Sequence, residues 1–150
     1  MAAPRSSIDA ALLVLRLAGL GLAVFHGWPK LASLVGGTSR FHEGLATMGL
    51  PFPVAFAWAA GLAETVGGLL VALGFFTRLA AGACAIAMTV AAFLRHHAHH
   101  YLLGKLGLYT VTPEMEKSWG NPELALMYLG AFVSLVLAGG GRFSLDRGRR

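Results

Sequence analysis

The chain has 150 residues, enough for one domain, and 56% of them are hydrophobic while only 13% are charged. Its mean hydropathy is +0.65. A soluble domain carries about 25% charged residues, so the composition excludes an ordinary protein whose whole surface faces water. Glycine is commoner in membrane helices than in soluble ones, and the 20 glycines agree with a chain that faces lipid.

The net charge of +5 does not indicate a nucleic-acid-binding protein, because the basic residues form no stripe with interleaved aromatic side chains. Much of the excess lies in one C-terminal cluster that consists of Arg142, Arg147, Arg149 and Arg150. A basic tail beside a membrane segment is typical of a cytoplasmic end near anionic headgroups. We therefore expect the lipid bilayer, and no nucleic acid, as a partner.

Four apolar segments predict membrane-spanning helices at about 8–28, 54–76, 79–97 and 123–138. A span needs about 20 apolar residues. The first two segments reach that length, and the last two reach it only when flanking interfacial residues are included. The first is expected to be an uncleaved helix rather than a signal peptide, because Arg16 interrupts it and no small-residue cleavage site follows. The predicted fold class is all-α, an integral membrane four-helix bundle in a single domain over residues 1–150.

The connections predict the topology of this bundle. Phe76-Thr77-Arg78 is a tight turn, whereas the links at 29–53 and 95–122 are long, and both long links fall on the side opposite the termini. Six Lys or Arg residues lie in the termini and the short turn, against five in the much longer links. The positive-inside rule therefore assigns both termini to the cytoplasm. Within the first link, Phe41–Leu50 has the pattern of a short amphipathic helix.

Arg16 and Glu64 interrupt the first and second apolar segments. At 1.5 Å per residue, Arg16 lies about 12 Å from one end of its helix and Glu64 about 15 Å from the opposite end of the next. A lone charge at that depth costs from about 3 to over 10 kcal/mol, so we expect the two side chains to pair. The pair is either the centre of a proton or quinone site or a structural ion pair that sets helix register.

Two more side chains are expected on the outer side, His26 near the end of the first helix and Glu123 at the start of the fourth. With His96 and His97 they form a predicted outer cluster. Glu123 also has a structural interpretation. In Asn121-Pro122-Glu123, an N-cap is followed by proline at the first helical position and by an acid that complements the helix dipole.

The run His96, His97, Ala98, His99, His100 follows the third segment. On a continued helix His96 and His100 lie four residues apart on one face, the spacing of paired metal ligands, and imidazole suits zinc, copper, iron or nickel. A haem held by His26 and His96 or His97 is a second alternative. The third alternative is that the histidines only make this interface polar, since no acidic or cysteine partner lies in the run.

Other motifs are absent or structural. The sequence has no nucleotide-binding glycine fingerprint, Walker loop, His-Glu-x-x-His or nucleophile elbow, which argues against a self-contained hydrolase or kinase. Gly61, Gly67 and Gly68 are expected to be close-packing points between helices. Cys84 is the lone cysteine, so it forms no internal disulfide and is expected to be a small buried hydrophobe.

Several motifs are spread along nearly the whole chain. They are Leu15-Arg16-Leu17, Phe25-His26-Gly27 with Lys30-Leu31, Ala63-Glu64 with Gly67-Gly68, Gly74-Phe75-Phe76-Thr77-Arg78, and the tail Gly141-Arg142-Phe143-Ser144-Leu145-Asp146. Together they resemble the DoxX family of small bacterial membrane proteins. The chain departs from that pattern by its four clustered histidines, where the family commonly has one or two, and by a longer link at 102–119.

The resemblance implies a four-helix bundle in the bacterial inner membrane with both termini in the cytoplasm. Related proteins include the DoxD-like subunit of a thiosulfate:quinone oxidoreductase, members of membrane complexes coupled to oxidative-stress enzymes, and distant assembly chaperones. We therefore expect an accessory or redox-associated subunit beside other membrane subunits, with a quinone near Arg16, Glu64 and His26, rather than a stand-alone enzyme. A non-catalytic docking or assembly module is one alternative, and a metal-binding or haem-binding membrane protein is another.

Overall fold

The computed structural model describes residues 5–148, and these residues form helices and loops with no strand among them. Within residues 5–148, three helical stretches are long and apolar enough to cross a membrane: Ser6–Val35, Pro53–Leu73 and Thr77–Arg95. There are four if the bent pair Pro113–Trp119 and Glu123–Ala138, inclined at 45°, is counted as one span. The prediction of an all-helical protein with several membrane spans is confirmed.

Each long stretch joins α-helical pieces to a π-helical turn, in which the hydrogen bonds reach one residue further than in an α-helix. The first is α1 (Arg5–Leu22), η1 (Ala23–Gly27) and α2 (Trp28–Val35). The second is α4 (Pro53–Leu62), η2 (Ala63–Gly67) and α5 (Gly68–Leu73), and the third is α6 (Thr77–Thr89) and η3 (Val90–Arg95). The other elements are α3 (Phe41–Thr47), α7 (Ala98–Lys105), α8 (Pro113–Trp119), α9 (Glu123–Ala138) and the 3-10 turn η4 (Leu145–Gly148).

The first helix continues past Pro29 to Val35, further than the sequence predicted. A proline inside a helix has no N–H to donate, and its ring clashes with the carbonyl four residues earlier. Here the π turn η1 comes directly before α2, and the Trp28 N–H bonds to the carbonyl of Ala23. This wider turn accommodates Pro29, so the helix does not end there.

The second and third stretches also differ at their ends from the predicted helices. The second ends at Leu73 because Gly74 adopts a left-handed conformation (φ 71°), which terminates a helix. The third begins at Thr77 and ends at Arg95, since His97 is also left-handed (φ 46°). The turn between them is therefore as short as the sequence indicated.

Large apolar side chains point outward from the spanning helices, and Leu79 has 74% of its surface exposed. The interior holds many small residues, larger apolar ones such as Phe132 and Leu22, and a few polar side chains, among them Arg16 at 2% and Glu64 at 3% exposure. Soluble monomers rarely expose large contiguous apolar patches. The arrangement therefore fits contact with lipid tails.

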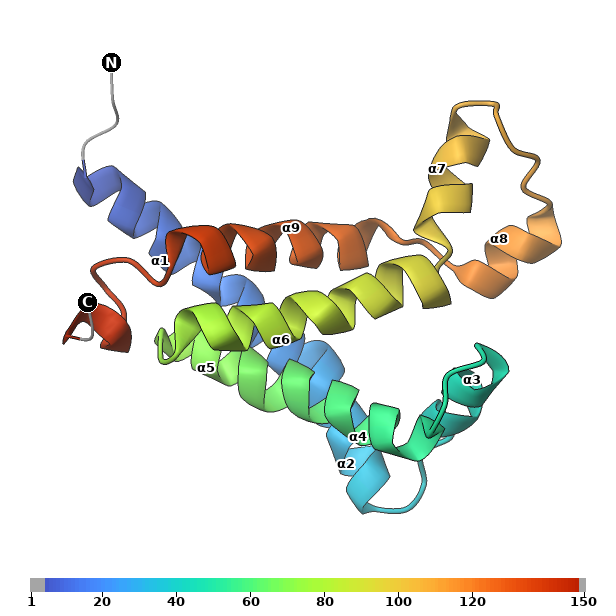
Figure 1. Cartoon of the computed structure of the whole chain (residues 1–150), viewed down its shortest axis with the longest axis horizontal. Coiled ribbons are helices and arrows are strands. Elements are labelled where there is room, and N and C mark those ends of the chain that lie inside the picture. The colour runs from blue at the N-terminus through green and yellow to red at the C-terminus, as the bar shows by residue number, and fades with distance from the viewer. Residues whose placement is uncertain (1–4, 149–150) are drawn as a thin grey trace.

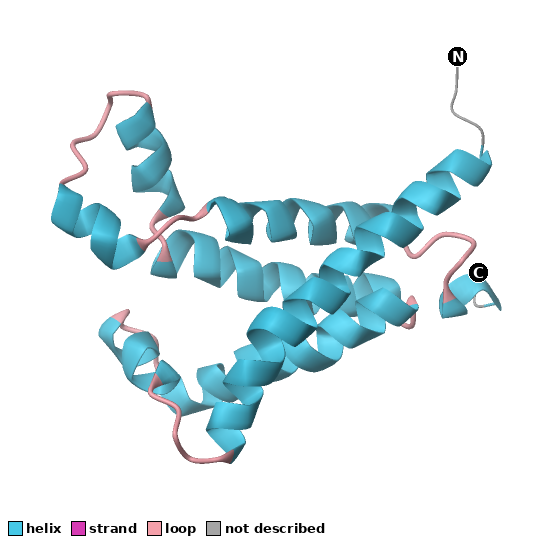
Figure 2. Ribbon diagram, turned by 180° about the vertical axis from the view of Figure 1, so that it is seen from behind, coloured by secondary structure: helices cyan, strands magenta, loops and turns pink. Residues whose placement is uncertain are grey.

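The helices α6 and α9 lie side by side, while α1 crosses obliquely against α5 and α9 (Figures 1 and 2). The start of α1, the turn between α5 and α6 and the C-terminal segment lie at one end of the molecule (Figure 1). The short helices α3, α7 and α8 lie at the other end. Of the basic C-terminal cluster, Arg149 and Arg150 lie outside the described residues.

Candidate functional site

A cavity of about 750 Å³ lies between the helices, towards the end that carries α3, α7 and α8. Its wall is mostly apolar, with alanines and larger side chains from α3, α4, α6 and α9. The polar side chains on the wall are His26, Lys30, Glu64, Arg95, His96, Asn121 and Tyr128. Ligand cavities commonly enclose about 300–1,000 Å³ and combine an apolar lining with a few polar groups, so this cavity has the size and character of a binding site.

Lys30 and Glu64 form an ion pair on the cavity wall. The Lys30 Nζ lies 2.5 Å from Glu64 Oε1, and the side chains are 20% and 4% exposed. The ammonium also lies 4.5 Å from the centre of the Phe41 ring, a cation–π contact from α3. The other carboxylate oxygen, Glu64 Oε2, is buried and has no hydrogen-bond partner in the part of the chain that the structure describes. One oxygen of this carboxylate is therefore left with its hydrogen-bonding capacity unused.

Each π turn contributes a polar side chain to the cavity: His26 from η1, Glu64 from η2 and Arg95 from η3. A π turn inserts an extra residue into a helix and re-aims the neighbouring side chains, and such turns are frequent at functional sites. Gly27 lets η1 and η2 touch, because a Cβ there would lie 2.5 Å from the backbone nitrogen of Thr65. His26 and Glu64 are thus held on adjoining backbones.

Hydrogen bonds from the end of η3 fix the rim of the cavity. The His96 Nδ1 lies 2.6 Å from the carbonyl oxygen of Trp119, and Arg95 Nη1 donates to the carbonyl oxygen of Ser118 at 2.9 Å. A carbonyl oxygen only accepts, so His96 Nδ1 carries a proton in this bond. His26 packs edge-on against Tyr128 with ring centres 6.0 Å apart. His26 and His96 therefore share one cavity, and a haem between them stays a prediction.

The predicted pair between Arg16 and Glu64 is wrong. Arg16 donates to the carbonyl oxygens of Phe143 at 3.0 Å and Gly140 at 3.4 Å. Its guanidinium lies against Gly74, and residues 64 and 74 are about 15 Å apart along a helix. The depth estimate assumed that Ile8 and Val54 mark the two membrane surfaces. Because the first helix instead continues to Val35, Lys30 rather than Arg16 reaches Glu64.

The C-terminal segment accounts for Arg16 and for the tail motif. The carboxylate of Asp146 accepts hydrogen bonds from the backbone N–H groups of Phe76 and Thr77, each at 2.8 Å, and from Thr77 Oγ1 at 2.6 Å. The first N–H groups of a helix have no partner within it, so Asp146 caps α6 from a distant part of the chain. With Arg16 bound to the same segment, both residues have a structural role.

The histidine run does not form the predicted metal pair. The third helix ends at Arg95 and the chain reverses at His97, so the continued helix on which His96 and His100 would share a face is absent. Instead, one ring nitrogen from each of His97, His99 and His100 lies within 4.8 Å of the others. Burial, and then the neighbouring His100 and His99, lower the pKa of His97 and favour its neutral form.

Glu123 is exposed at the start of α9. Its backbone N–H donates to Asn121 Oδ1 at 2.8 Å, so Asn121 satisfies the first N–H of α9, although the N-cap position itself is occupied by Pro122 and not by Asn121 as predicted. Among the described residues that line the cavity, Asn121 is present and Glu123 is not. The exposed position of Glu123 outside the cavity wall favours its structural interpretation.

Sequence reasoning missed Lys30 and Tyr128 as cavity residues. Lys30 lies four residues after His26, and that spacing places both on one face of a helix that continues through Pro29. The signal was present but depended on an unbroken helix. Tyr128 carried no comparable signal, because a tyrosine near a helix end is typical of any membrane interface.

Comparisons with known proteins give one family and two relatives. The sequence model of the DoxX family matches residues 11–97. The chain is 32% identical over 136 residues to the inner membrane protein YphA of Escherichia coli K12, covering 91% of this chain and 88% of that protein. It is 37% identical over 87 residues to an uncharacterized protein of Haemophilus influenzae, covering 58% and 57% of the two chains. No solved structure matches at a significant level.

Proposed function

The chain belongs to the DoxX family and is a multi-pass protein of the bacterial inner membrane, and from that premise we propose that it is a quinone-linked accessory subunit of a redox complex. The observation that carries the proposal is the mostly apolar cavity with the ion pair of Lys30 and Glu64 on its wall. A quinone has an apolar ring and tail and two carbonyl oxygens. It therefore calls for an apolar enclosure with a few well-placed polar groups.

The polar side chains on the wall suit this ligand class. The ammonium of Lys30 and the hydroxyl of Tyr128 are hydrogen-bond donors for carbonyl oxygens. Glu64 Oε2, which has no hydrogen-bond partner among the described residues, would hold or release a proton. A bound quinone would supply the redox chemistry by taking up two electrons and two protons, and Glu64 would serve the proton part of that exchange.

Binding of a quinone analogue to the purified protein in mild detergent tests the proposal. Glu64→Gln is expected to weaken binding by roughly tenfold or more, because a hydrogen bond to a charged group contributes about 1.5–3 kcal/mol. The matched control is Glu43→Gln, an exposed acid on α3 that should bind like wild type. Absence of binding by the wild-type protein would overturn the proposal.

The accessory role is tested by affinity purification in the same detergent. A second membrane or membrane-associated subunit should be recovered in stoichiometric amount, and a clean monomer would contradict this part of the proposal. Recovery of a partner together with no quinone binding would instead favour a non-catalytic docking or assembly module.

We also propose that α9 is the fourth span of a single-domain bundle, with both termini in the cytoplasm. This is supported by the packing of α9 along α6 and by the shared position of the C-terminal segment, the α5–α6 turn and the start of α1 (Figure 1). Single cysteines at residues 118 and 147, placed in a Cys84→Ser background, test it in intact spheroplasts. An impermeant maleimide should label Ser118→Cys and not Arg147→Cys; the reverse pattern would contradict the topology.

A further inference from the structure

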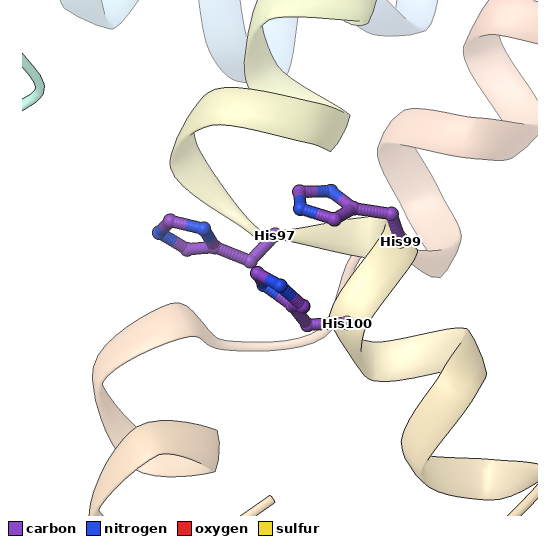
Figure 3. A group of neighbouring side chains, drawn as sticks. All are labelled: His97, His99 and His100. Atoms are coloured by element: carbon purple, nitrogen blue, oxygen red, sulfur yellow. The ribbon is translucent and has the colours of Figure 1, made fainter. Parts of the chain in front are cut away.

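Three histidines gather outside the cavity, where the chain turns from η3 into α7 (Figure 3). Their side chains are contributed by His97 at the reversal and by His99 and His100 in the first turn of α7. One ring nitrogen from each lies within 4.8 Å of the other two. We propose that His97, His99 and His100 bind a divalent transition-metal ion of the zinc, copper or nickel class.

The spacing of the nitrogens is close to that of a ligand set. A zinc–nitrogen bond of about 2.0–2.1 Å in tetrahedral geometry separates two ligand nitrogens by about 3.4 Å. The three nitrogens therefore need to approach by about 1.5 Å at most to reach that geometry. His99 is exposed, so its ring can turn inward without displacing the core.

The backbone at His97 is what brings the cluster together. Residues 99 and 100 are consecutive in a helix and do not share a face, and His97 precedes the helix. The left-handed conformation of His97 (φ 46°) returns its side chain to the first turn of α7. Such a conformation is strained in a non-glycine residue and concentrates at sites that hold ligands.

Aromatic rings surround two of the three histidines. The His100 ring stacks on Tyr109 with centres 4.6 Å apart, and the His97 ring lies 4.8 Å from that of Trp119. These contacts limit the rotation of both imidazoles. The Nδ1 of His100 is buried and has no hydrogen-bond partner among the described residues, which is an independent sign that this ring lacks a partner that a ligand would supply.

The donor set selects the class of metal. Three imidazoles without a carboxylate suit zinc, copper or nickel, whereas magnesium and calcium prefer oxygen ligands. The guanidinium of Arg95, the nearest strong cation in sequence, donates to the carbonyl oxygens of Ser118 and Trp119. Three protein ligands would leave one coordination position for water or another ligand.

Metal titration of the full chain tests the inference. Metal-stripped protein in detergent, purified with a tag free of histidine, is titrated with Zn²⁺ and Cu²⁺ by calorimetry. Wild type should bind one ion per chain. His97→Ala, His99→Ala and His100→Ala should each weaken binding by at least about tenfold, since even residues that only support a metal ligand contribute that much.

Two other histidines supply the matched controls. His42 lies on α3, so His42→Ala should bind the metal like wild type, and His96, which is hydrogen-bonded to Trp119 and is not one of the three ligands, should be needed less than any of them. Loss of binding in His96→Ala and His100→Ala but not in the other variants would assign the ion to the helix-spaced pair and overturn the inference. So would the absence of one-to-one binding by wild type.

The fold and the cavity are monitored in the same preparations. His99 is exposed, so His99→Ala should keep the circular dichroism and melting temperature of wild type, and metal loss in that variant cannot be ascribed to misfolding. His99 does not line the cavity, so quinone-analogue binding should also be unchanged in His99→Ala. The two sites can therefore be confirmed or rejected separately.

Discussion

Gly19 and Gly68 bring the backbones of α1 and α5 into direct contact, because a Cβ on either residue would lie 2.5 Å from the carbonyl oxygen of the other. Helices in lipid gain little from apolar burial and associate through close packing of small residues. The prediction that Gly68 is a close-packing point is confirmed by this contact. Gly67 serves the neighbouring interface, since its added Cβ would lie 3.1 Å from Cys84 Sγ.

Gly68→Ala is expected to lower the free energy of unfolding by about 1–3 kcal/mol, the usual cost of overpacking an interior. The measurement is unfolding by SDS in detergent micelles, followed by circular dichroism. Gly82 on α6 has nothing within 4 Å of an added Cβ. Gly82→Ala should therefore keep or raise stability, because alanine is the better helix former by about 1 kcal/mol. Equal losses in both variants would contradict the close crossing.

The ion pair of Lys30 and Glu64 is expected to be strongly coupled. Lys30→Met leaves Glu64 buried and unpaired, and breaking a buried pair costs about 3–5 kcal/mol. Lys30→Met combined with Glu64→Leu should recover most of that loss, as measured by a double-mutant cycle of unfolding free energies. The exposed pair Lys105 and Glu116, at 4.0 Å, is the control and should couple by at most about 1 kcal/mol. A similar coupling in both pairs would count against the buried one.

Asp146→Asn is expected to destabilise the protein by about 1–3 kcal/mol, because charged hydrogen bonds to Phe76 and Thr77 at the start of α6 are lost or weakened. The readout is the melting temperature of the detergent-solubilised protein. Arg147→Ala, which removes an exposed side chain beside it, should melt like wild type. If Asp146→Asn also melts like wild type, the tail does not cap α6.

Cys84 should not react with maleimide in the folded protein, because the thiol is fully buried and donates to the carbonyl oxygen of Ala63 in η2. Thiol reactivity requires access as well as the thiolate form. Labelling should be at least about 100-fold slower than that of a cysteine introduced at the exposed Ser118, and should become complete in SDS. Comparable rates before unfolding would show that the interior around α6 is open.

The sequence was sufficient for the elements whose signal is local. The apolar runs predicted the helical spans, glycines marked where helices approach closely, and Asn121 marked the start of α9. Each follows from rise per residue, side-chain volume or capping chemistry within a few neighbouring residues. The motifs that resemble the DoxX family could likewise be recognised in the sequence alone, and the family is confirmed.

Which charges meet was decided by the tertiary structure. A π turn before Pro29 lets the first helix continue, and only then does Lys30 reach Glu64, while Arg16 is bound by a tail more than a hundred residues away. A reversal at one residue, His97, likewise exchanges the His96 and His100 pair for a cluster of three. Residue spacing in the sequence gives distances along a helix. It does not give the turns and crossing points that set the distances between helices, and the candidate sites depend on the distances between helices.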